Sequence, residues 1–166
     1  PRIADVDVDI VLNHAVMGQI DAHLRSPAGN DIGLFTDIGA AAAGGQTQMD
    51  LVLDDEAAAP PSFTVLKGVR LKPELNYRLS WLDGENAGGT WTLDLRDDTG
   101  DVNGGTLTSW SMRVCEAPPP PTCAWLVLYT SMPLMASAAN CAKLNARVPP
   151  STPPIEVAFP DLARWA

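Results

Sequence analysis

Apolar and polar residues alternate along short segments of this chain, and this period of two limits the fold more than any other feature. Alternate side chains of a strand share one face, so each such run predicts a β-strand with one buried face. Six runs show the pattern: Val6, Val8, Ile10 and Leu12; Ile20, Ala22 and Leu24; Met49, Leu51 and Leu53; Tyr77, Leu79 and Trp81; Trp91, Leu93 and Leu95; and Trp110, Met112 and Val114.

Turn-forming residues separate most of these runs. Residues 26–30 read Ser-Pro-Ala-Gly-Asn, and residues 44–45, 84–89 and 97–105 are rich in glycine or aspartate. Short amphipathic strands at near-regular intervals, without a helical stretch, are typical of an antiparallel sandwich or barrel. Two-sheet closure also protects the edges of many short strands. The sequence therefore predicts an all-β fold, a jelly-roll-like antiparallel sandwich of about eight strands.

Composition divides the chain into two parts. All 13 glycines precede Cys115, whereas 10 of the 15 prolines follow Glu116. Residues 118–121 are four consecutive prolines, which favour a stiff polyproline II spacer. We therefore predict a β-sandwich domain over 1–116, a proline-rich linker over 117–122, and a C-terminal appendage of unknown structure over 123–166.

The negative charge of the chain is concentrated in the predicted domain, and it limits which classes of partner the domain can bind. The chain has a net charge of −9. An acidic surface repels phosphate, which argues against nucleic acid and against an anionic membrane as partners. Residues 124–139 are uncharged, but this stretch contains Pro133 and is too short for a membrane span. Divalent cations remain compatible with this charge.

Three cysteines are too few for a disulfide scaffold and lack the paired spacing of a zinc site. Two arrangements are open: Cys123 with Cys141, which leaves Cys115 over, or Cys115 with Cys123 across the proline run.

Four segments resemble one family in order along the chain. Residues 14–29 run from a histidine to Ser-Pro-Ala-Gly, and residues 53–57 read Leu-Asp-Asp-Glu-Ala. Residues 89–93 read Gly-Thr-Trp-Thr-Leu, and residues 107–112 read Leu-Thr-Ser-Trp-Ser-Met. These motifs resemble the P (Homo B) domain of kexin- and furin-like proprotein convertases and of bacterial subtilisin-like serine proteases. The resemblance covers about residues 3–115, and it departs from the family at Val16, at Gln19 and in the alanine-rich segment 35–45.

The resemblance implies a fold similar to galactose-binding domains and a non-catalytic accessory role. The domain would support the folding and stability of a subtilisin-like catalytic domain on the same secreted polypeptide, and thereby proteolysis. The alternative is a secreted adhesion or binding module for carbohydrate or protein. Buried Trp91 and Trp110 would oppose that alternative, and an exposed aromatic platform would favour it. We expect both rings in the core, with glycines 104 and 105 closing a hairpin between their strands.

Two short motifs resemble active-site motifs of subtilisin, but they do not predict a catalytic triad. Residues 98–100 read Asp-Thr-Gly and residues 130–132 read Thr-Ser-Met. A triad needs serine, histidine and carboxylate together, and subtilisins carry them in the order Asp, His, Ser. Both histidines, His14 and His23, precede Asp98. We therefore predict structural histidines and no catalytic residue.

Acidic clusters on predicted loops suit calcium, which takes six to eight oxygen ligands. A third cluster, around residues 97–103, begins like an EF-hand loop but has Trp110 at its twelfth position. Similarity to calcium-binding P domains favours the other two clusters. The candidate calcium ligands are Asp54, Asp55, Glu56, Asp83 and Glu85.

Overall fold

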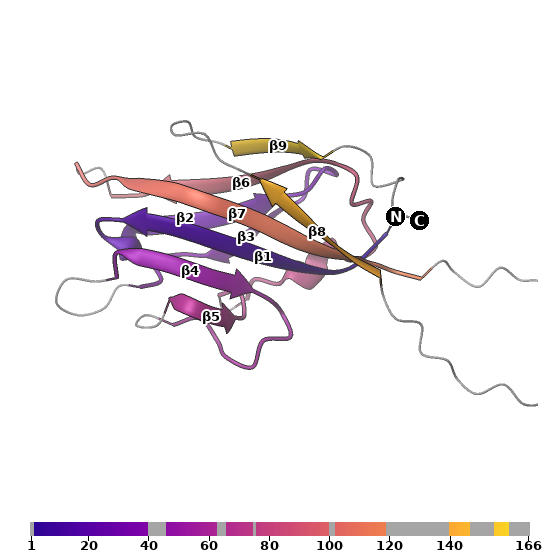
Figure 1. The fold of residues 1–166 in the computed structure, drawn as a ribbon, viewed down its shortest axis with the longest axis horizontal. Helices are drawn as coiled ribbons and strands as arrows, with labels where there is room; N and C mark the ends of the chain where they lie inside the picture. The colour runs from indigo at the N-terminus through magenta and orange to yellow at the C-terminus, as the bar shows by residue number, and fades with distance from the viewer. Residues whose placement is uncertain are drawn as a thin grey trace, which may run out of the picture.

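The protein is a β-sandwich, seen here in a computed structural model (Figure 1). The structure describes residues 2–39, 46–62, 66–74, 76–99 and 102–118, and the backbone of 140–146 and 155–159. The described strands form a five-stranded sheet of order β5-β4-β1-β7-β8 and a four-stranded sheet of order β3-β2-β6-β9. Their bounds are β1 Ile3–His14, β2 Ile20–Arg25, β3 Asp31–Phe35, β4 Gln48–Leu53, β5 Lys67–Leu71, β6 Gly89–Asp97, β7 Gly105–Glu116, β8 Asn140–Ala146 and β9 Ile155–Phe159. The predicted all-β sandwich is confirmed.

The apolar phases of the predicted strands form the core between the sheets. In β1 the side chains of Val6, Val8, Ile10 and Leu12 are buried, as the alternation predicts. The same holds for the apolar positions of β2 and β4. Trp91 on β6 and Trp110 on β7 are 0% and 1% exposed, so the prediction that both rings lie in the core is confirmed.

The run from Tyr77 to Trp81 is not a strand. A short 3₁₀ helix, η2, occupies Leu79–Leu82, and Trp81 is 56% exposed. A 3₁₀ helix repeats every three residues, so Leu79 and Leu82 share the buried side and Trp81 turns outward. Period-two spacing over so few residues did not distinguish the two structures.

The arrangement of the strands differs from the prediction in two places. β6 and β7 lie in different sheets, so residues 104 and 105 do not close a hairpin between them. β4 and β5 are parallel, whereas the other paired strands among the described residues are antiparallel. Residues 54–66 connect β4 and β5, which is the long crossover that a parallel pair requires.

Gly89 shows why the start of β6 carries glycine. Its φ is +131°, and an added Cβ would lie 2.7 Å from Cβ of Pro27. Both the backbone conformation and the neighbouring turn thus require glycine. The predicted turn at residues 26–30 is confirmed, since Ser26 N–H donates to the Asn30 carbonyl.

Two strands come from the segment that the sequence sets apart as an appendage. β8 pairs with β7, and β9 pairs with β6, so each extends one sheet. Most of the predicted linker lies outside the described residues, and the division at 117–122 stays a prediction. Cys115 is disulfide-bonded, and the register places it opposite Cys141. The arrangement that leaves Cys115 unpaired is therefore wrong.

Candidate functional site

The turn that follows β4 carries the first predicted acidic cluster. Asp54 is buried, and its carboxylate accepts hydrogen bonds from Arg70 Nη1 at 2.5 Å and from the Glu56 backbone N–H at 2.7 Å. Burial opposes ionisation of Asp54, but these bonds outweigh it and hold the pKa of Asp54 below its ordinary value. Asp54 therefore ties the turn to β5 as an ionised group.

An ion-pair network extends from this turn across the outer face of the sheet. Asp7 of β1 is 3% exposed, and its carboxylate lies 3.3 Å from Arg70 Nη1 and 2.6 Å from Arg113 Nη2. Arg70 thus joins Asp7 to Asp54. The two arginines compensate the buried charge of Asp7, which would otherwise destabilise the fold.

Asp55 stabilises the start of η2. Its two carboxylate oxygens accept hydrogen bonds from the backbone N–H groups of Leu79 at 3.0 Å and Ser80 at 2.9 Å. The first N–H groups of a helix lack partners within it, so a carboxylate satisfies them well. Asp55 fixes the position of η2 relative to the turn after β4.

Three carboxyl groups near this end of the sandwich ionise less readily than usual. A hydrogen bond with Asp54, followed by burial and the charge of Asp5, raises the pKa of Glu56. Burial first, and then the charges of Asp5 and Asp55, raise the pKa of Asp83. Burial and the charge of Asp7 raise the pKa of Asp5 itself, although Arg113 opposes this. Like charges are therefore crowded here.

The predicted calcium ligands do not form a cage as they stand. Glu85 is bonded to the Asn30 amide at 2.5 Å, and Asp54 and Asp55 hold the partners described above. Within the part of the chain that the structure describes, no group of three or more His, Cys, Asp or Glu side chains is placed to hold a metal ion. Calcium binding at this site would require Asp54, Asp55 and Glu85 to exchange partners, and it stays a prediction.

The histidines have structural partners. His14 is buried at the end of β1, where Nδ1 lies 2.8 Å from the Val16 carbonyl oxygen and Nε2 lies 3.2 Å from an Asp97 carboxylate oxygen. His23 is half-exposed and lies 3.2 Å from a carboxylate oxygen of Asp31. Of the subtilisin-like motifs, residues 98–99 lie on an exposed turn, and residues 130–132 lie outside the described residues.

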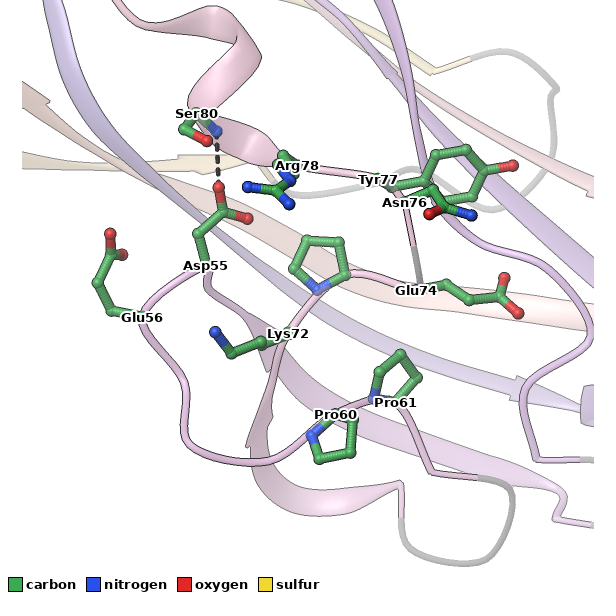
Figure 2. Close-up of a pocket in the computed structure, with 11 residues that line it drawn as sticks. Asp55, Glu56, Pro60, Pro61, Lys72, Glu74, Asn76, Tyr77, Arg78 and Ser80 are labelled. Carbon is green, nitrogen blue, oxygen red and sulfur yellow. Dashed lines mark hydrogen bonds between the residues drawn. The ribbon is translucent and has the colours of Figure 1, made fainter.

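A pocket of about 720 Å³ opens beside η2 and the turn after β4 (Figure 2). Its apolar wall consists of Pro60, Pro61, Pro73 and the Tyr77 ring. The polar lining residues are Asp55, Glu56, Lys72, Glu74, Asn76, Arg78 and Ser80. A pocket of this size suits a small ligand or a few side chains of a peptide.

Sequence reasoning identified two of these lining residues, Asp55 and Glu56, and missed the two cations. Arg78 lies within the run from Tyr77 to Trp81 that the alternation assigned to a strand, and Lys72 lies outside the predicted runs, so nothing in the sequence marked them as pocket residues. These two cations border the same pocket as Asp55 and Glu56 because η2 and the crossover before β5 bring their segment to the turn after β4.

One segment of the chain resembles a known protein family. Residues 66–114 match the family model of the proprotein convertase P-domain. This segment is similar to the P-domain of proprotein convertases. It contains the 89–93 and 107–112 motifs with both buried tryptophans, whereas the 14–29 and 53–57 motifs lie before it. No curated protein and no solved structure matches the chain.

The P-domain match covers β5, η2, β6 and nearly all of β7, together with the pocket residues from Lys72 to Ser80. P domains are non-catalytic accessory domains that accompany the catalytic domain of subtilisin-like proteases. No helix among the described residues is long and apolar enough to cross a membrane.

Proposed function

We propose that this chain is the non-catalytic accessory P domain of a secreted subtilisin-like serine endopeptidase. The observation that carries the proposal is the match of residues 66–114 to the proprotein convertase P-domain. In this proposal the catalytic domain belongs to the same polypeptide. The sandwich supports its folding and stability, and proteolysis is the process it serves.

The burial of Trp91 and Trp110 supports this role over a binding role for those two residues. Both rings lie in the core, where they stabilise the sandwich and cannot stack on a sugar. A secreted binding or adhesion module remains the second candidate. The exposed indole of Trp81 on η2 favours it, because an exposed aromatic ring is a common contact for ligands.

The test is to isolate the native polypeptide that carries this segment and to ask whether it contains an active-site serine. An antibody raised against residues 1–116 recovers it, and a fluorophosphonate probe then labels any active-site serine. The proposal expects a species larger by at least the mass of a catalytic domain, labelled by the probe and protected from labelling by a serine-protease inhibitor. A larger unlabelled species, or a free chain of this length, would favour the binding module instead.

A further inference from the structure

We draw no further inference here: the strongest candidate, the surface around the exposed Trp81 indole on η2, at the end of the sandwich where Arg2 pairs with Asn86, is a single exposed aromatic side chain, and nothing in the structure shows what covers it.

Discussion

The two core tryptophans differ in one hydrogen bond, and this difference predicts unequal costs of the same substitution. Trp91 Nε1 donates to the Ala87 carbonyl at 3.0 Å, and Ala87 is itself buried. Trp110 Nε1 is buried and has no hydrogen-bond partner among the described residues. We therefore compare Trp91→Phe with Trp110→Phe.

The magnitude follows from what each substitution leaves behind. Both remove part of an indole from the core and create a similar cavity, so this cost largely cancels in the comparison. Trp91→Phe also leaves the Ala87 carbonyl without its donor, which costs about 1–3 kcal/mol. Trp110→Phe instead removes a buried N–H group that had no partner, which offsets part of its cavity cost. We expect Trp91→Phe to lower the free energy of unfolding by about 2 kcal/mol more than Trp110→Phe.

The assay is urea unfolding followed by far-ultraviolet circular dichroism, because tryptophan fluorescence changes with the substitutions themselves. Equal slopes of free energy against urea would show that both variants unfold to similar ensembles. In thermal unfolding, the same difference corresponds to about 4–8 °C in Tm for a chain of this length. A Trp110→Phe variant as unstable as Trp91→Phe, or less stable, would refute the reasoning.

Three further predictions concern the predicted calcium site, the crowded carboxyl groups and the pocket wall. The calcium prediction expects a higher Tm in excess calcium than in chelator, since a ligand of the folded state stabilises it, and equal values would contradict it. The raised pKa values of Glu56 and Asp83 mean that the folded chain takes up protons more readily than the unfolded chain, so Tm should rise as pH falls from neutrality toward the ordinary values of 4.5 for Glu and 3.8 for Asp. The lowered pKa of Asp54 acts in the opposite sense, so Tm should drop again below about pH 4. A Tm that falls steadily as pH is lowered from neutrality would contradict this account, and so would a Tm rise in Glu56→Gln equal to that of the unmodified chain. Gly33→Ala should destabilise the chain by about 1–3 kcal/mol, because its methyl group would overlap the Tyr77 ring, whereas Gly104→Ala has open space around it; equal urea midpoints would show that the ring is not held there.

The predictable part of the candidate site was its acidic turn. Asp54, Asp55 and Glu56 were singled out because acids cluster after a predicted strand, and that turn does border the pocket. Their partners were not predictable. Arg70 and the N–H groups of η2 reach them only through the crossover after β4 and through the 3₁₀ helix, and neither leaves a local signal in the sequence.

The sequence by itself determined the strands whose faces differ in polarity. Alternation located β1, β2, β4, β6 and β7 and their buried phases, and the Gly-Thr-Trp-Thr-Leu and Ser-Trp-Ser motifs pointed to the P domain. A strand with one buried face needs apolar residues at alternate positions, so the pattern is visible in the sequence of that strand alone.

Tertiary structure decided which strands became neighbours and which charges met. Asp7 lies beside Arg113, which is 106 positions away, because β1 pairs with β7 in one register. The parallel pairing of β5, the separation of β6 and β7 into different sheets, and the exposure of Trp81 likewise depend on packing between distant segments. A period of two tells which side of a strand is apolar, but it does not tell which strand lies next to it, because backbone hydrogen bonds between strands are the same for any sequence.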